Sequence, residues 1–189
     1  MAAFLRQALA GGRQLSMLAA RPSSVVMSPA VQLAARRFKP SFVGEDGWVQ
    51  VEETLAGPPY QNVVLDGRHE TLVDEPMTFP DGQDTGMNPY QFLVASLGAC
   101  TSVTVRLYAN RNNIPLERIR VFTKHDRIYA KDCETCTTKT GKVDKIFVKV
   151  QLEGDLTADQ RNKLMQIANF CPVHKTLTTE TIVDVAAME

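Results

Sequence analysis

Residues 88–110 form the stretch that most constrains how this chain can fold. Asn88 is a favoured N-cap and Pro89 is suited to the first helical position, where its missing N–H costs nothing. Apolar or small residues occupy nearly every turn on all sides, which predicts a helix enclosed by protein. The apolar run at 92–105 is too short, and too often interrupted by Ser and Thr, for a membrane span of ~20 residues. We therefore expect a core helix with Cys100 in its middle, and no membrane partner.

A second cysteine lies at a favourable electrostatic position near the C-terminus. Cys171 precedes Pro172, which predicts that Cys171 is the N-cap of a short helix. A thiolate there faces unpaired backbone N–H groups and the positive end of the helix dipole, which lower a thiol pKa below ~8.5. His174 is one turn on, on the same face, where it can help to hold the thiolate. A buried cysteine is most often a small apolar residue, but this second site favours a reactive thiol pair.

The other predicted elements place strands both before and after the helices. Asp66-Gly67 supplies a tight turn between two short strands, and Thr157 with Gln160 forms a capping box that opens an amphipathic helix. Because strands and helices do not alternate strictly, the predicted class is α+β. We expect strands within 48–54, 62–73 (a hairpin), 119–130, 142–152 and 181–185, a Gly/Pro-rich loop at 79–87, and a helix over 157–168.

The first 38 residues differ in composition from the remainder. They contain five Arg and no Asp or Glu, as transit peptides do, and Arg36-Arg37-Phe38 resembles a processing site. We expect a mitochondrial transit peptide at 1–38, a single folded domain at 39–189 and a matrix location. Chloroplast import is the lesser alternative, and a cytosolic extension stays open. Without this segment the chain has sixteen basic and twenty-one acidic residues, which argues against nucleic-acid binding.

The chain contains the motifs Asn88-Pro-Tyr-Gln, Leu97-Gly-Ala-Cys100-Thr-Ser-Val-Thr and Cys171-Pro-Val-His174-Lys-Thr-Leu. These motifs resemble those of the OsmC/Ohr family of thiol-dependent peroxidases, and the resemblance extends over about residues 63–185. The resemblance implies an OsmC/Ohr-type fold, with a long central helix packed between curved antiparallel sheets in an intertwined homodimer. It also implies that Cys100 attacks a hydroperoxide and that Cys171 resolves the sulfenate as a disulfide.

The resemblance also assigns supporting roles. The family uses an arginine of the early sheet to stabilise the thiolate, and Arg68 is the candidate here. Organic hydroperoxide resistance members carry a Glu where this chain has Tyr90, so the substrate and the activity itself stay open. The expected partners are a small hydroperoxide, organic in view of the apolar residues beside Cys100, and a dithiol reductant of lipoyl or thioredoxin type. No metal or organic cofactor is expected. The expected substrate contacts are Tyr90, Gln91, Leu97 and His174.

Cys133 and Cys136 support other hypotheses. With Cys171 and His174 they form a ligand set that suits tetrahedral Zn²⁺, as in a structural or scaffold protein. They could instead form an auxiliary disulfide that passes oxidation on, with His125 nearby. A member of the fold without peroxidase activity is the remaining alternative.

Overall fold

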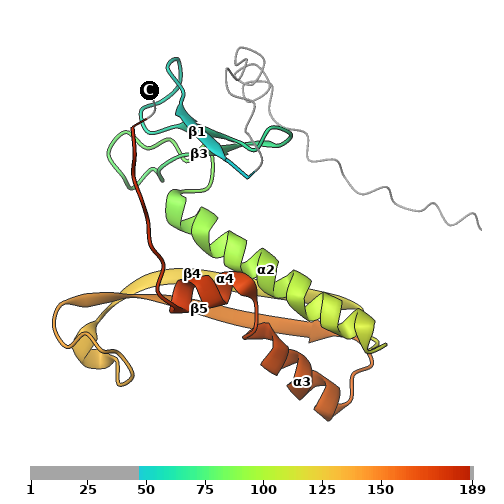
Figure 1. Cartoon of the computed structure of the whole chain (residues 1–189). Coiled ribbons are helices and arrows are strands. Elements are labelled where there is room, and N and C mark those ends of the chain that lie inside the picture. The colour runs from blue at the N-terminus through green and yellow to red at the C-terminus, as the bar shows by residue number, and fades with distance from the viewer. Residues whose placement is uncertain (1–46, 188–189) are drawn as a thin grey trace, which may run out of the picture. The chain divides into compact units, whose positions relative to one another are not determined.

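The computed structural model describes residues 47–187 (Figure 1). The predicted transit peptide and its processing site lie outside the described residues. The α+β class is confirmed. The elements are β1 (Gln50–Glu53), β2 (Asn62–Leu65), β3 (Glu70–Val73), α2 (Pro89–Arg111), β4 (Arg118–Tyr129), the 3-10 helix η1 (Ala130–Asp132), β5 (Lys142–Glu153), α3 (Ala158–Ala168) and α4 (Pro172–Thr178).

The first three strands form an antiparallel sheet in the order β1-β2-β3. The predicted hairpin turn is confirmed, and the Asp66 carboxylate organises it by accepting the backbone N–H groups of Arg68 (2.9 Å) and His69 (2.7 Å). Gly67 follows at φ +87°, a conformation that glycine adopts without a side-chain penalty. The side chain of Arg68 is therefore carried on an exposed turn.

The loop between β3 and α2 is held by a buried carboxylate. Asp74, 1% exposed, accepts hydrogen bonds from the Thr85 hydroxyl (2.7 Å), the Thr85 N–H (3.1 Å) and the Glu75 N–H (2.8 Å). Gln61 in turn donates from Nε2 to the Thr85 hydroxyl at 2.7 Å. At the end of the loop, Gly86 lies so close to β3 that an added Cβ would clash with the Leu72 carbonyl oxygen. These contacts fix where α2 begins.

Helix α2 starts as the sequence predicts. Asn88 and Gln91 form a capping box, each side chain bonding the backbone N–H of the other residue. The prediction of a helix enclosed on all sides is wrong for the single chain, because one face is buried and the opposite face is exposed. The buried face consists of Val94, Leu97, Gly98, Thr101, Val105 and Ala109, whereas the large apolar side chains exposed on α2 are Tyr90, Leu93, Val103 and Leu107.

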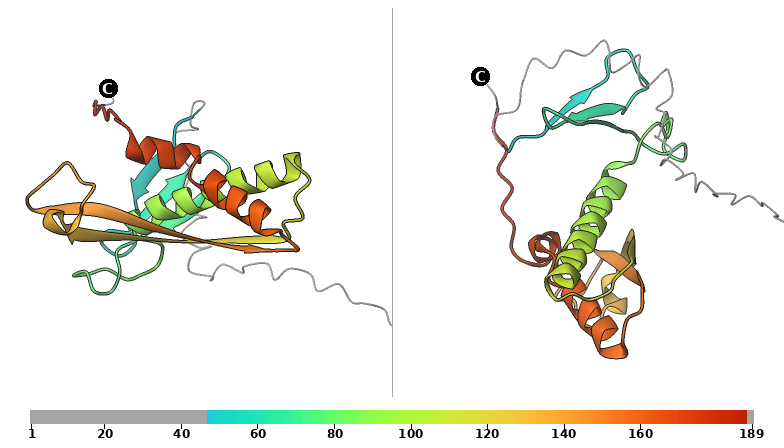
Figure 2. Two further views of the ribbon diagram at one scale, coloured as in Figure 1. Left: turned by 90° about the horizontal axis from the view of Figure 1, so that it is seen from below. Right: turned by 90° about the vertical axis from the view of Figure 1, so that its right-hand side faces the viewer.

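Strands β4 and β5 form a long antiparallel hairpin, paired from Arg118↔Glu153 to Tyr129↔Lys142. The helices lie on one face of this hairpin (Figure 2). Gly98 permits the close approach of α2 to β4, since an added Cβ would stand 3.3 Å from the Thr123 methyl group. The core lies where the helices meet the open end of the hairpin, and its fully buried members are Val105, Ala109, Leu116, Leu152 and Leu164.

Two short helices complete the layer against α2. Helix α3 begins at the predicted capping box, in which Thr157 and Gln160 bond each other's backbone N–H. Helix α4 begins with Cys171 as N-cap and Pro172 at its first position, as predicted. Both helices pack against α2.

The predicted strand at 181–185 is wrong for this chain. This segment has no strand partner among the described residues, and its apolar side chains Ile182, Val183 and Val185 are 80%, 80% and 94% exposed. A strand exists only where a neighbouring strand accepts and donates its backbone hydrogen bonds, so pattern alone does not create one.

By length and mean hydropathy alone, α2 would qualify as a membrane-spanning helix. Its buried face packs on β4 in the way of a core helix.

Candidate active site

Two free cysteines from distant parts of the sequence meet between α2 and α4. Cys100 lies in the middle of α2 and Cys171 is the N-cap of α4. Helix α4 packs against α2, and each thiol shifts the pKa of the other, so the two thiols lie near each other. The sequence predicted both residues, and the packing of α4 against α2 explains why they come together.

Cys171 is the thiol whose ionised form is stabilised. It is fully buried, and burial by itself raises the pKa of this thiol. Hydrogen bonds outweigh the burial and leave the Cys171 pKa below its ordinary value of 9.0; the donors include the Cys100 thiol, the His174 N–H and the Thr101 hydroxyl. The His174 N–H lies 3.4 Å from Sγ. The thiolate of the pair therefore resides first on Cys171.

The pKa of Cys100 is shifted in the opposite direction to that of Cys171. Burial, followed by the contact with Cys171, raises the Cys100 pKa above 9.0, although the Val173 N–H and the Thr104 hydroxyl act in the other direction. Cys100 is nevertheless the more accessible sulfur, because it is half-buried whereas Cys171 is 0% exposed. The pair thus combines an accessible thiol with a buried thiolate that accepts its S–H.

His174 contributes its backbone N–H to this arrangement. Its ring Nδ1 lies 2.7 Å from the carbonyl oxygen of Asn169, and since a carbonyl only accepts, Nδ1 is the donor. The ring is therefore engaged with the end of α3, whereas the sequence suggested that it supports the thiolate.

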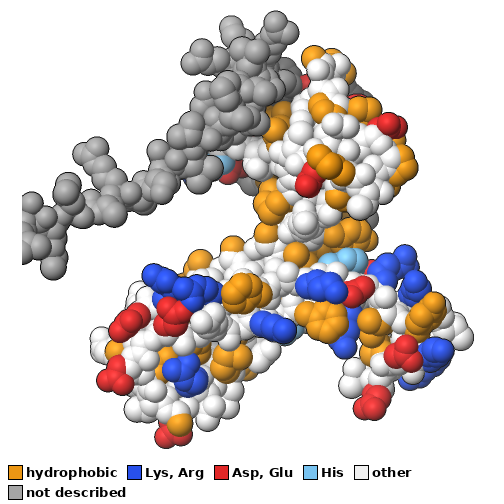
Figure 3. All heavy atoms as spheres, turned by 180° about the vertical axis from the view of Figure 1, so that it is seen from behind, with side chains coloured by type: hydrophobic (Ala, Val, Ile, Leu, Met, Phe, Trp, Pro, Cys, Tyr) orange, Lys and Arg blue, Asp and Glu red, His pale blue; other side chains and the backbone are white. Residues whose placement is uncertain are grey.

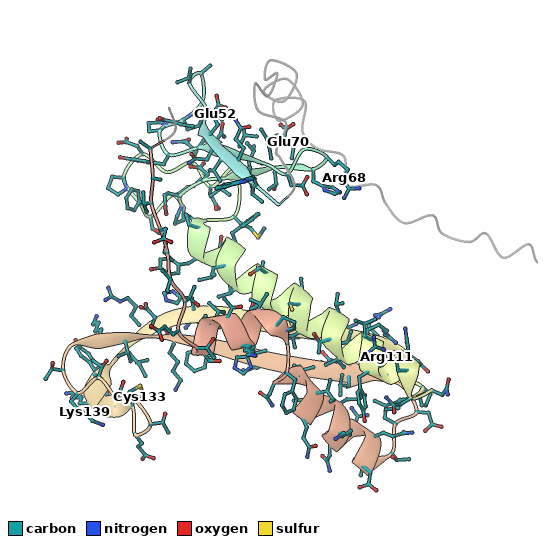
Figure 4. All side chains as sticks on the ribbon, viewed as in Figure 1. Glu52, Arg68, Glu70, Arg111, Cys133 and Lys139 are labelled. Carbon is teal, nitrogen blue, oxygen red and sulfur yellow. A yellow bond between two sulfur atoms is a disulfide. The ribbon has the colours of Figure 1, made fainter. Side chains whose placement is uncertain are left out.

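The other predicted site residues lie in several places. Leu97 is buried on the same helix as Cys100, and the Gln91 side chain is used by the capping box. Tyr90 stacks on His125, with ring centroids 4.1 Å apart. Arg68 lies on the β2–β3 turn (Figure 4), and its side chain forms no hydrogen bond or ion pair within residues 47–187.

A polar group at the start of α2 was not predicted. His125 on β4 has a side chain only 14% exposed, and its Nε2 lies 2.9 Å from Oδ1 of Asp144 on β5. Tyr90 covers the ring from α2. Asp126 follows His125 in the sequence, but neighbouring strand residues face opposite sides, so the partner comes from the adjacent strand.

The zinc hypothesis is not supported by the positions of its ligands. Cys133 and Cys136 form a disulfide in the tip of the β4–β5 hairpin, with their Cα atoms 5.5 Å apart. Cys171 and His174 belong to α4 instead, and residues 47–187 contain no cluster of three potential metal ligands. The disulfide was one of the alternatives that the sequence left open.

Comparison with known proteins places this arrangement in a family. The chain resembles the crystal structure of an organic hydroperoxide resistance protein OsmC from Legionella pneumophila (20% identity, 69% of this chain and 88% of that chain, TM-score 0.50). It also resembles an OsmC-like protein from Mycoplasma pneumoniae (15% identity, 70% and 87%, TM-score 0.54). A third similar structure is an organic hydroperoxide resistance protein from Elizabethkingia anophelis (17% identity, 69% and 86%, TM-score 0.51). These likenesses show the fold.

No curated protein matches the chain significantly. The family model described as OsmC-like protein matches residues 82–186, which include both free cysteines and cover more than half of the sequence. The chain therefore belongs to the OsmC-like protein family.

Proposed function

We propose that this protein is a thiol-dependent peroxidase that reduces organic hydroperoxides. The observation that carries the proposal is the proximity of Cys100 and Cys171, the two free cysteines of the described residues, which the packing of α4 on α2 brings together. An accessible thiol beside a buried thiolate is the arrangement that a two-cysteine peroxidase needs, since one sulfur is oxidised and the other closes the disulfide.

In the first step, Cys100 attacks the outer oxygen of the hydroperoxide. The Cys171 thiolate takes the S–H proton of Cys100 as the attack proceeds, so it acts as an internal base. The O–O bond breaks and the S–O bond forms. The alkoxide takes this proton from Cys171 and leaves as an alcohol, so Cys171 is a thiolate again. Cys100 becomes a sulfenic acid and the hydroperoxide has gained two electrons.

In the second step, the Cys171 thiolate attacks the Cys100 sulfenic sulfur. The S–S bond forms, the S–O bond breaks, and the hydroxide takes up from solvent the proton that Cys171 released when it ionised. In total, two thiols and one hydroperoxide yield a disulfide, an alcohol and water. An external dithiol of lipoyl or thioredoxin type then reduces the disulfide by exchange. Because Cys171 is ionised first, resolution proceeds without a further deprotonation step.

Apolar surroundings support an organic substrate. Leu97 is buried one turn before Cys100, and Val103, which lies three residues after it, is 58% exposed. Two of the structures with this fold carry the name organic hydroperoxide resistance protein. We infer that Tyr90 and Leu97 contact the organic group, and that Arg68 stabilises the thiolate as in the family.

The second candidate is an OsmC-like protein without peroxidase activity. The observation in its favour is Tyr90, an uncharged residue that stacks on His125 where organic hydroperoxide resistance members have a Glu. The two candidates differ in whether Cys100 reacts with a hydroperoxide at all.

Single-cysteine variants separate these candidates. Cys100→Ser should abolish the consumption of dithiol with cumene hydroperoxide, whereas Cys171→Ser should give one turnover and a sulfenate that dimedone traps. Cys133→Ser is the matched control, because Cys133 lies in the hairpin tip, and it should keep the parent rate. Equal activity in Cys100→Ser and the parent would remove the peroxidase proposal. Comparison with hydrogen peroxide tests the preference for an organic substrate.

We also propose that the protein works as a homodimer. Hydrophobic side chains are visible on the face of the molecule in Figure 3. Leu107 of α2 and Phe122 of β4 are 48% and 57% exposed. Exposed apolar patches often mark surfaces that another protein covers. A second copy of the chain would bury the apolar side chains that α2 exposes in the single chain. Val103→Glu should shift the mass in light scattering towards one chain. Gln166→Glu, an equal change at an exposed polar position, should leave it unchanged.

Import into mitochondria is a further part of the proposal, based on the five Arg and absent acids of residues 1–38. A fusion of residues 1–38 to a fluorescent reporter should enter the matrix. A fusion in which these five Arg are replaced by Gln is the control and should stay in the cytosol.

A further inference from the structure

The tip of the β4–β5 hairpin contains a disulfide that the proposed peroxidase reaction does not use. Cys133 and Cys136 are bonded with only two residues between them, directly after η1. Both cysteines are half-buried, and the residues around them are exposed. Figure 4 labels Cys133 and the neighbouring Lys139 at this tip.

The tip disulfide lies far from the Cys100–Cys171 pair. Gly98, two residues before Cys100, packs on Thr123 of β4. Ala130, where the tip begins, is seven residues further along the chain, or roughly 23 Å at the rise of an extended strand. Two cysteines exchange a disulfide only when their Cα atoms come within about 7 Å. The two cysteine pairs of one chain are therefore chemically separate.

Backbone hydrogen bonds also close the tip, in addition to the disulfide. The Ala130 N–H donates to the Gly141 carbonyl at 2.9 Å, and the Cys133 N–H donates to the Ala130 carbonyl at 3.1 Å. The strand pairing continues up to Tyr129↔Lys142. A disulfide that closes so short a loop also removes little entropy from the unfolded chain. The fold is therefore compatible with both the disulfide and the dithiol.

The charges at the tip favour a thiolate on Cys136. The ammonium group of Lys139 donates to the Cys136 carbonyl oxygen at 2.8 Å, which holds a cation beside this residue. Lys131 and Lys142 lie over the Tyr129 ring, 5.5 Å and 5.1 Å from its centroid. Nearby cations stabilise thiolates, and a stabilised thiolate leaves faster in disulfide exchange. The acidic residues Asp132 and Glu134 oppose this effect in part.

We propose that Cys133 and Cys136 form a second redox site, which exchanges with an external dithiol independently of Cys100 and Cys171. A thiolate of the external dithiol attacks the Cys133 sulfur, the Cys133–Cys136 bond breaks, and Cys136 leaves as a thiolate that takes up a proton. The second external thiol then displaces Cys133 from the mixed disulfide. In total two electrons and two protons pass to the pair, and the external dithiol becomes a disulfide.

Peptide mapping after equilibration tests the proposal directly. The full-length protein is incubated in reduced and oxidised dithiothreitol at graded ratios, quenched, alkylated and digested with trypsin. Residues 132–139 lie between Lys131 and the cut after Lys139, so one peptide holds both cysteines of the site. We expect this peptide to pass from no alkyl group to two in one two-electron transition, at the same ratio in the Cys100→Ser/Cys171→Ser double variant.

A pair of lysine variants tests the assigned charge. Lys139→Met should slow the reduction of Cys133–Cys136 by dithiothreitol roughly two- to fivefold, the effect of losing one exposed charge interaction. Lys131→Met is the matched control, because that ammonium lies over Tyr129 instead, and it should have the smaller effect. Trypsin is replaced by a protease that cuts elsewhere for these variants.

Two results would overturn the proposal. The peptide could resist full reduction in the folded protein and yield only in urea, which would make the disulfide purely structural. Alternatively, both cysteines could be free before any reductant is added and hold one zinc ion per chain, which would make the tip a metal site.

Discussion

Replacing Thr101 with valine isolates one contribution to the reactivity of the thiol pair. Thr101 is 1% exposed, and its hydroxyl lowers the pKa of Cys171 through a hydrogen bond. Valine keeps the shape and removes only this donor. A hydrogen bond to a charged group contributes about 1.5–3 kcal/mol, and each ~1.4 kcal/mol is a factor of ten in an equilibrium constant. At a pH below the pKa, the Cys171 thiolate fraction should fall roughly 10- to 100-fold.

The direction of the pH change follows from which form the bond stabilises. The hydroxyl stabilises the thiolate, so its loss raises the pKa of Cys171. The acidic limb of the peroxidase pH profile should therefore move to higher pH. Thr104→Val is the matched control, because the Thr104 hydroxyl lowers the pKa of Cys100. This variant should therefore raise the pKa of Cys100, the second thiol to ionise, and leave the ionisation of Cys171 unchanged.

The ultraviolet absorbance of the thiolate measures both steps. In a Cys133→Ser/Cys136→Ser background, Cys100 and Cys171 are the cysteines that titrate. The reasoning is refuted if Thr101→Val leaves both the first titration step and the acidic limb unchanged, or if Thr104→Val displaces that first step equally.

Two further predictions concern the loop before α2. Asp74→Asn should destabilise the fold at neutral pH by roughly 1–3 kcal/mol in urea unfolding, because an amide NH₂ cannot accept the Thr85 hydrogen bonds. Burial raises the Asp74 pKa, but hydrogen bonds outweigh it and lower the pKa below 3.8. The difference in the free energy of unfolding between the parent and Asp74→Asn should thus shrink as the pH falls from 3.8 through the folded-state pKa. A difference that stays constant over this pH range would contradict this prediction. Gly86→Ala should lower the melting temperature because its Cβ meets the Leu72 carbonyl, whereas Gly67→Ala meets no neighbouring atom and should show only the smaller cost of its positive φ.

Features that depend on neighbouring residues in the sequence were predicted well. The capping boxes at Asn88 and Thr157 are local hydrogen-bond patterns between residues three apart, and both are confirmed. The Asp66-Gly67 turn and the N-cap position of Cys171 are of the same kind. Each of these signals is complete within a few residues, so the sequence contains all of the information.

Contacts between residues that are far apart in the sequence were not predicted from the sequence pattern. His125 finds Asp144 through the register of β4 with β5, and Tyr90 covers it from another element. The His174 ring is occupied by the Asn169 carbonyl, which depends on how α3 ends. The cysteine spacing allowed either zinc or a disulfide, and only the position of the hairpin tip distinguishes them. Long-range contacts of this type leave no short sequence signature.

Helix α2 exposes apolar side chains and also contains Cys100. Its sequence suits a helix covered all round, yet Leu93, Val103 and Leu107 are 38%, 58% and 48% exposed. Covering the exposed half of three such side chains contributes roughly 2–4 kcal/mol per copy. A dimer with a micromolar dissociation constant requires about 8 kcal/mol of binding free energy. The α2 helices of two copies together reach this value only at the upper end of the range, so other exposed apolar residues must also take part. Cys100 is half-buried on this same helix, so a second copy that covers α2 would also control how a hydroperoxide reaches its sulfur.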